Sequence, residues 1–72
     1  MNINERVAEK IRQLRENKGL SQKAVAQALF RSRQAYGDLE NGKKKIEIED
    51  LAQIATFHNQ SLMYFLSDFE RL

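Results

Sequence analysis

Residues 20–42, LSQKAVAQALFRSRQAYGDLENG, decide the fold because two helix start signals stand only eleven residues apart in this stretch. Ser21 and Ser32 can each offer a side-chain oxygen to the free backbone N–H groups of a following helix. This spacing leaves room for about two helical turns and a tight connection between the two signals. It predicts one short helix that begins at Gln22 and another that runs from residue 33 to residue 39 or 40.

Apolar side chains recur at every third or fourth residue on both sides of this stretch, as in a helix that buries one face. The pattern predicts a first helix over residues 4–18, ended by Gly19 in a left-handed conformation. It also predicts a fourth helix over residues 47–58, with Asn59 in the same role, and a last helix capped by Ser61. Because the chain has no proline and only three glycines, we expect an all-α fold, a compact five-helix bundle.

The length of 72 residues is enough for one small domain, residues 1–72. The absence of cysteine and the single histidine, His58, exclude a disulfide framework and a Cys/His zinc site. The sequence has no phosphate-binding loop and no recognisable catalytic triad, so we expect no enzyme, cofactor or metal. No apolar run reaches the ~18–20 residues of a membrane span. We therefore expect a soluble, cytoplasmic protein with no membrane partner.

The charge is divided unevenly along the chain. Residues 1–45 carry eleven basic and five acidic side chains, a net charge of +6. Residues 46–72 carry one basic and five acidic side chains, a net charge of −4. This asymmetry favours a polyanionic partner for the first two thirds of the chain, although an ordinary solvated surface is the alternative.

Two short helices joined by a tight turn have the geometry of a helix-turn-helix. At this point the chain resembles the phage-repressor and Cro-like helix-turn-helix regulators, the Xre family. The resemblance covers residues 7–66 and depends on several motifs in the right order. It implies a lambda-repressor-like DNA-binding fold in which the second and third helices form the helix-turn-helix. The matching segments are LRENKGLSQKAVAQAL (14–29), SRQAYGDLENGK (32–43) and IEIEDLAQIATFHNQSLMYFL (46–66).

The same resemblance implies a set of DNA contacts. Arg33, Gln34 and Asp38 would face the major groove, where arginine suits guanine, glutamine suits adenine and aspartate accepts from cytosine. A second group would contact phosphates, through side chains, backbone groups and the positive end of a helix dipole. The alternative is that all of these are ordinary solvated residues. The phosphate candidates are Gln22, Lys23, Ser32, Asn41, Lys43 and Lys44.

The resemblance also pairs Arg15 with Glu40, as an ion pair that fastens the first helix to the end of the third. A surface pair contributes only about 0–1 kcal/mol, so we expect this one to position the helices and not to stabilise them. Tyr36 stands where the family has a buried aliphatic residue. We expect its ring in the core and its hydroxyl at the surface.

Three residues depart from the family pattern. Phe30 replaces a turn glycine, and a left-handed phenylalanine would cost ~1–2 kcal/mol, so either the turn differs or packing of the ring recovers the cost. Gly37 weakens the third helix by roughly 0.5–1 kcal/mol, and we expect it to make room for the sugar-phosphate backbone. Ile46 replaces a frequent proline, which predicts a less firmly fixed start of the fourth helix.

The resemblance implies a homodimer on palindromic double-stranded DNA, because two-fold symmetry places two recognition helices ~34 Å apart. Residues 57–72 hold more bulky apolar groups than one short helix can bury. We expect Leu62, Phe65 and Leu66 inside the bundle, and Tyr64, Phe69 and Leu72 at the dimer interface.

The expected function is transcriptional regulation, by a repressor that occupies its operator. The alternative is a protein-interaction module or antitoxin-like co-regulator on the same scaffold, with little direct reading of DNA.

Overall fold

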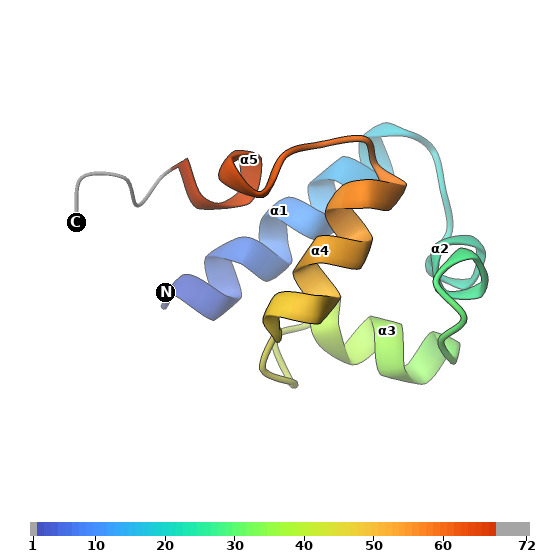
Figure 1. Cartoon of the computed structure of the whole chain (residues 1–72). Coiled ribbons are helices and arrows are strands. Elements are labelled where there is room, and N and C mark those ends of the chain that lie inside the picture. The colour runs from blue at the N-terminus through green and yellow to red at the C-terminus, as the bar shows by residue number, and fades with distance from the viewer. Residues whose placement is uncertain (1, 68–72) are drawn as a thin grey trace.

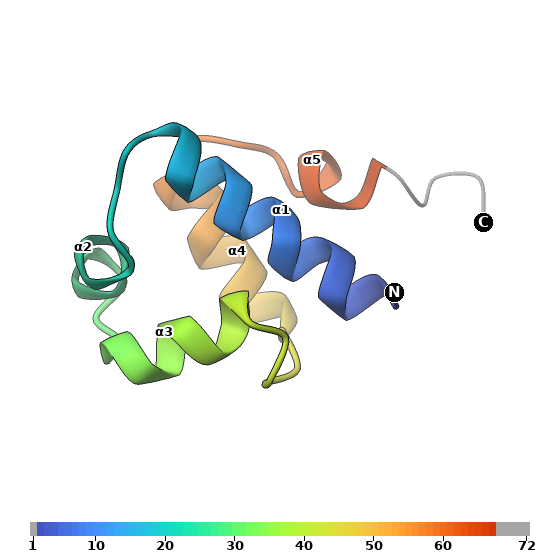
Figure 2. The same cartoon turned by 180° about the vertical axis from the view of Figure 1, so that it is seen from behind.

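The computed structural model describes residues 2–67, which form five α-helices and no strand. Figures 1 and 2 show α1 and α4 crossing the middle of the molecule, α3 along one edge, and α2 and α5 toward opposite ends. The prediction of an all-α, five-helix fold is confirmed. No helix among residues 2–67 has the length and apolar character needed to cross a membrane. The helices are α1 (Ile3–Asn17), α2 (Gln22–Ala28), α3 (Arg33–Glu40), α4 (Ile48–Phe57) and α5 (Leu62–Leu66).

Short-range hydrogen bonds start the helices where the sequence indicates. The hydroxyl oxygens of Ser21 and Ser32 each accept from a backbone N–H three residues later, at 3.0 Å, and that of Ser61 does the same at 3.3 Å. The first helix begins one residue earlier than predicted, because Asn2 and Glu5 exchange side-chain and backbone hydrogen bonds at 2.8 and 3.1 Å.

Four helices end in the same way. The second residue after each of α1 to α4 has a positive φ, between 56° and 72°. Each of these residues lies in a Schellman motif, in which two backbone N–H groups return to carbonyls of the last helical turn. The residues are Gly19, Phe30, Gly42 and Asn59.

All five helices contribute to one hydrophobic core. Ala26 of α2 is buried where α2 and α3 pack together, and Phe65 is the buried residue of α5. Leu20, Leu29, Ile46 and Phe57 pack against the core from its edges. The core residues are Val7, Ile11, Leu14, Val25, Ala26, Tyr36, Leu39, Leu51, Ile54, Ala55 and Phe65.

Two predictions about buried side chains are wrong. Leu62 and Leu66 are 42% and 36% exposed, because α5 has only five residues and turns a single side chain, Phe65, into the core. Tyr36 is wholly buried, and its hydroxyl has no hydrogen-bond partner among the described residues. Of the dimer candidates, Phe69 and Leu72 lie outside the described residues.

Candidate nucleic-acid interface

The outer face of α3 is open to solvent. Arg33 and Gln34 are exposed and Asp38 is half-buried, whereas Tyr36 and Leu39 on the opposite face are in the core. Gln34 Nε2 lies 3.5 Å from Asp38 Oδ1, so the two side chains share this face one turn apart. The fold therefore holds α3 by one side and presents amide, guanidinium and carboxylate groups on the other.

The phosphate candidates lie around both ends of α3 and at the start of α2. Lys23 is exposed near the start of α2, and Ser32 is exposed at the start of α3, where its hydroxyl caps the helix. Asn41 and the two lysines that follow Gly42 are exposed beyond the end of α3. The backbone N–H groups of Lys43 and Lys44 donate to the Asp38 carbonyl at 3.0 and 3.3 Å. These bonds fold the basic loop back onto the helix that carries the base-reading candidates.

Gln22 is half-buried, and its amide is directed into the protein. Its Nε2 donates to Glu40 Oε1 at 3.1 Å, which ties the start of α2 to the end of α3. A Cβ on Gly37 would lie 3.4 Å from Gln22 Oε1. Gly37 is buried, so the expectation that it makes room for the sugar-phosphate backbone is wrong. The glycine makes room for Gln22.

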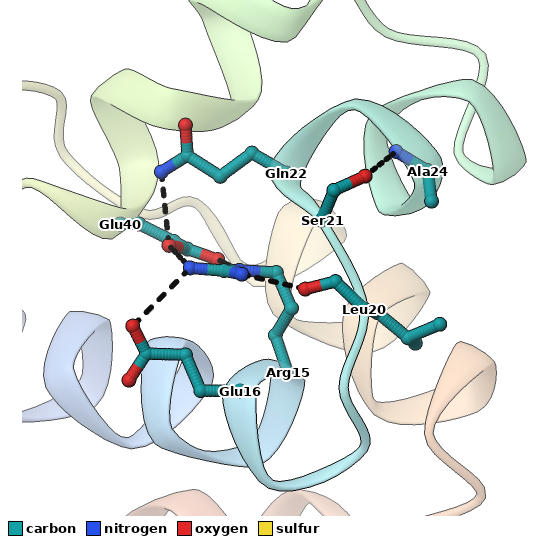
Figure 3. Close-up of polar contacts among 7 residues, drawn as sticks. All are labelled: Arg15, Glu16, Leu20, Ser21, Gln22, Ala24 and Glu40. Atoms are coloured by element: carbon teal, nitrogen blue, oxygen red, sulfur yellow. Dashed lines mark hydrogen bonds and ion pairs between the residues drawn. The ribbon is translucent and has the colours of Figure 1, made fainter.

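Arg15 and Glu40 meet at the centre of this arrangement (Figure 3). Arg15 Nε donates to Glu40 Oε2 at 2.7 Å, and Nη2 donates to Oε1 at 3.1 Å. The third guanidinium nitrogen, Nη1, donates to the Leu20 carbonyl at 2.7 Å. Both residues are buried, so the expectation of a surface pair is wrong. A single arginine thus joins α1, the loop before α2 and the end of α3.

The protonation of this cluster follows from its contacts. Burial alone would raise the pKa of Glu40, but hydrogen bonds from Arg15 and Gln22 outweigh burial and hold that pKa below its usual value. The hydrogen-bonded carboxylate in turn raises the pKa of Arg15. Burial first, and then the neighbouring Glu40 carboxylate, raises the pKa of the Tyr36 hydroxyl. At neutral pH the cluster therefore holds one cation, one anion and one neutral phenol.

A contact that the sequence analysis missed fixes the turn between α2 and α3. Arg31 Nη2 donates to Asp50 Oδ1 at 2.6 Å and to Gln53 Oε1 at 2.9 Å. Asp50 also accepts from the backbone N–H of Glu47 at 2.9 Å, through its other oxygen. The turn is thus tied to α4.

A second missed contact fixes the loop between α3 and α4. Asn4 Oδ1 accepts from the Ile46 N–H at 2.8 Å, and Asn4 Nδ2 donates to the Lys44 carbonyl at 3.3 Å. The expectation that Ile46 leaves the start of α4 loosely fixed is wrong. A proline at residue 46 would lack the N–H that makes this bond.

Phe30 fits neither of the two expectations stated for it. Its φ of 58° is left-handed, so the turn keeps the conformation that favours glycine. Its side chain is 98% exposed, so no packing recovers the conformational cost. Within residues 2–67, this cost has no compensating contact.

His58 is the C-cap residue of α4 and is buried. Its ring makes a T-shaped contact with the ring of Phe57. Neither ring nitrogen has a hydrogen-bond partner in the described part of the chain. Burial, followed by the charge of Lys18, lowers its pKa below the ordinary 6.5. Among residues 2–67, no three histidine, cysteine or acidic side chains are placed to hold a metal ion.

Comparisons with known proteins agree with this geometry. A family model described as a helix-turn-helix domain matches residues 6–62. The structure is similar to the crystal structure of the clp gene regulator ClgR from C. glutamicum, with a TM-score of 0.86 and 25% sequence identity. The match covers 94% of this chain and 88% of that one. No curated protein matches the chain.

Proposed function

Because the chain belongs to the helix-turn-helix domain family, we propose that it is a sequence-specific, double-stranded DNA-binding transcriptional regulator of the phage-repressor and Cro-like type. One observation carries this proposal. The outer face of α3 presents Arg33, Gln34 and Asp38 to solvent, while its inner face is locked to α1 and α2 through Arg15, Gln22 and Glu40. A rigidly held helix with polar groups on its open face is suited to enter the major groove.

Within this proposal, the three side chains have different roles. Arg33 donates to the two acceptors of guanine, and Gln34 pairs one donor and one acceptor with adenine. Asp38 accepts from cytosine and is already within reach of Gln34, so the two select neighbouring base pairs together. Each good contact discriminates against a wrong base by ~1–3 kcal/mol.

Phosphate contacts from both ends of α3 set the register of that helix on DNA. Lys23, Lys43 and Lys44 supply charge, whereas Ser32 and Asn41 supply hydrogen-bonding groups. Gln22 contributes in a different way from the lysines. Its amide is bonded inward to Glu40, so Gln22 holds the start of α2 in place and the backbone there faces the phosphate.

The working form in this proposal is a homodimer on a palindromic operator. The apolar side chains that α5 leaves exposed support an interface there: Leu62, Met63, Tyr64 and Leu66. Tyr64 is one of the three dimer candidates from the sequence; the other two, Phe69 and Leu72, are proposed from their apolar character alone. Two-fold symmetry would then place the two α3 helices in major grooves ~34 Å apart.

The mechanism we propose is operator occupancy. A dimer bound near a promoter controls access of the polymerase by its position and performs no chemistry. The resemblance to phage repressors favours repression as the outcome. Residues 1–72 would act as one DNA-binding unit.

Selection from a randomised duplex pool, followed by fluorescence anisotropy at two salt concentrations, tests this function. We expect an enriched palindrome and steep salt dependence, because log K falls by about 0.9 per phosphate neutralised for each tenfold rise in salt. The control is a duplex of equal length with a scrambled sequence. Absence of binding to any duplex at low salt would overturn the proposal in favour of a protein-interaction module.

A further inference from the structure

Polar clusters hold both ends of α3 to the rest of the protein. At its end, Glu40 accepts from Arg15 of α1 at 2.7 and 3.1 Å. Just before its start, the turn residue Arg31 donates to Asp50 of α4 at 2.6 Å and to Gln53 of α4 at 2.9 Å. Because α2 and α3 pack closely on each other, the two clusters fix the helix-turn-helix as one unit at two points.

Two points are needed to fix the direction of a short helix. The eight residues of α3 span ~12 Å. If only the end of α3 were held, a pivot of ~10° would move its start by ~2 Å. Hydrogen bonds to a base tolerate much less, since N–H···O distances lie between roughly 2.7 and 3.2 Å. The bonds of Arg31 therefore act where a change of direction would displace Arg33 and Gln34 most.

The surroundings of Arg31 distinguish it from a phosphate contact. Its place in the sequence, directly before the exposed Ser32 and Arg33, would suit such a contact. Its side chain is only 18% exposed, however, and its Nη2 makes both bonds to α4. Its Nε is buried and has no hydrogen-bond partner among the described residues. The guanidinium is thus directed into the protein and not toward DNA.

Asp50 serves two segments of the chain at once. It is 6% exposed. One carboxylate oxygen accepts from Arg31, and the other accepts from the backbone N–H of Glu47, the N-cap residue of α4. A single buried carboxylate therefore joins the start of α4 to the turn before α3.

We propose that Arg31, Asp50 and Gln53 are positioning residues for base reading, which set the direction in which α3 enters the major groove. This inference rests on the proposed DNA-binding function and concerns residues that contact neither base nor phosphate. Arg31 acts through Arg33 and Gln34, which follow it at the start of α3. Because Asp50 neutralises its charge, Arg31 contributes to sequence specificity and not to the general attraction of DNA.

Asp50→Asn separates positioning from electrostatics, because the two effects have opposite signs. Removal of a negative charge should strengthen binding to any duplex, whereas loss of the partner of Arg31 should weaken binding to the selected operator. We expect the ratio of operator affinity to scrambled-duplex affinity to fall at least about fivefold, since one good base contact discriminates by about five- to 150-fold. Glu49→Gln removes the same charge from an exposed position of α4. It is the matched control and should keep the wild-type ratio.

Two further variants examine the other members of the cluster. Arg31→Met should lower the ratio as Asp50→Asn does and keep the salt slope on the scrambled duplex, whereas loss of a phosphate contact would reduce that slope by about one. The double variant should lose no more than the larger single loss, because both changes remove the same bond. Gln53→Ala should lower the ratio to a smaller degree. Gln53 is exposed, so this variant gives the same readout without a change in the core.

Circular dichroism verifies that each variant is folded at the temperature of the binding measurement. A purely structural role would lower the unfolding temperature and leave the affinity ratio of the folded protein unchanged, a result that overturns the proposal. A salt slope reduced by about one in Arg31→Met, with both duplexes weakened equally, would also overturn it and assign Arg31 to a phosphate. A wild-type protein that binds no duplex would overturn the proposed function and this role together.

Discussion

Arg15 and Glu40 are 25 residues apart in sequence and form a two-point ion pair inside the protein, with N···O distances of 2.7 and 3.1 Å. The same guanidinium donates to the Leu20 carbonyl at 2.7 Å, and Gln22 donates to the same carboxylate at 3.1 Å. The pair thus holds the end of α3 against α1 and the start of α2. The orientation of the proposed recognition helix depends on these bonds.

Replacing Arg15 by methionine should destabilise the protein by about 3–5 kcal/mol, because it leaves a buried carboxylate without its cation. Urea unfolding measures the loss. Glu16→Gln is the matched control. Glu16 is exposed and lies 3.7 Å from the same guanidinium, so this variant should lose no more than about 0.5 kcal/mol of stability. Arg15→Met combined with Glu40→Met should recover much of the stability, since no buried charge remains. An Arg15→Met protein as stable as the Glu16→Gln protein would contradict the structural role of the pair.

His58 should make stability depend on pH below neutrality. Its folded-state pKa lies below 6.5 because of burial and Lys18, with Glu40 acting in the opposite direction. The unfolded chain therefore takes up the proton first as the pH falls. Stability is complete above about pH 6.5 and decreases as the pH drops from there toward the folded-state pKa.

Urea unfolding at a series of pH values checks this dependence. His58→Phe keeps an aromatic ring beside Phe57 and does not titrate, so it should lack the His58 contribution to the slope just below pH 6.5. Equal slopes for the variant and the wild type in that range would show that His58 is not the responsible group.

The parts of the fold that were predictable from the sequence depend on near neighbours. Ser21, Ser32 and Ser61 cap helices through bonds across three residues, and Gly19 and Asn59 end helices within one turn. These interactions are set by local backbone geometry. The helix pattern and the place of the turn follow from them.

The contacts that could not be predicted join residues far apart in the chain. Arg31 meets Asp50 across 19 positions, and Asn4 meets Ile46 across 42. In the sequence, Arg31 is a basic residue in a turn and Asp50 an acidic residue near the start of a helix. Nothing local marks them, or Asn4 and Ile46, as partners. Their partners are decided by how the helices pack. The burial of Arg15 was missed for the same reason.

The base-reading and phosphate roles should separate in binding measurements. Gln34→Ala should change sequence preference, because it removes a paired donor and acceptor from the open face of α3. Lys44→Ala should weaken binding to all duplexes about equally and reduce the salt slope by about one. Competition among operator variants at two salt concentrations distinguishes the two effects. A Gln34→Ala protein with unaltered preference would refute the assignment of α3 as the recognition helix.

Asn4 should control the order of the loop between α3 and α4. Asn4→Ala removes both side-chain bonds to residues 44 and 46 and leaves a partly buried N–H unsatisfied, which costs about 1–3 kcal/mol. Hydrogen exchange should show reduced protection of the Ile46 amide. Gln13→Ala, a change at an exposed position of the same helix, is the control and should leave that protection unchanged. Full protection in Asn4→Ala would mean that other contacts hold the loop.

Phe30→Gly should make the protein more stable, an unusual result for the loss of a large apolar side chain. Glycine relieves ~1–2 kcal/mol of left-handed strain, while its greater freedom in the unfolded chain costs roughly 0.5–1 kcal/mol. The net gain is therefore between about 0 and 1.5 kcal/mol, and its midpoint of about 0.75 kcal/mol corresponds to a rise in Tm of about 3–6 °C for a domain of this size.

Phe30→Ala and Asn59→Gly separate strain from the loss of the ring. Phe30→Ala keeps a Cβ in the left-handed conformation and loses a ring that is 98% exposed, so its Tm should stay close to that of the wild type. Asn59→Gly changes a residue with nearly the same φ, and because asparagine tolerates this geometry its gain should be smaller than that of Phe30→Gly. Thermal unfolding at low protein concentration, where protomers do not associate, gives the comparison. A lower Tm for Phe30→Gly than for Phe30→Ala would mean that the left-handed conformation of this turn does not strain the phenylalanine.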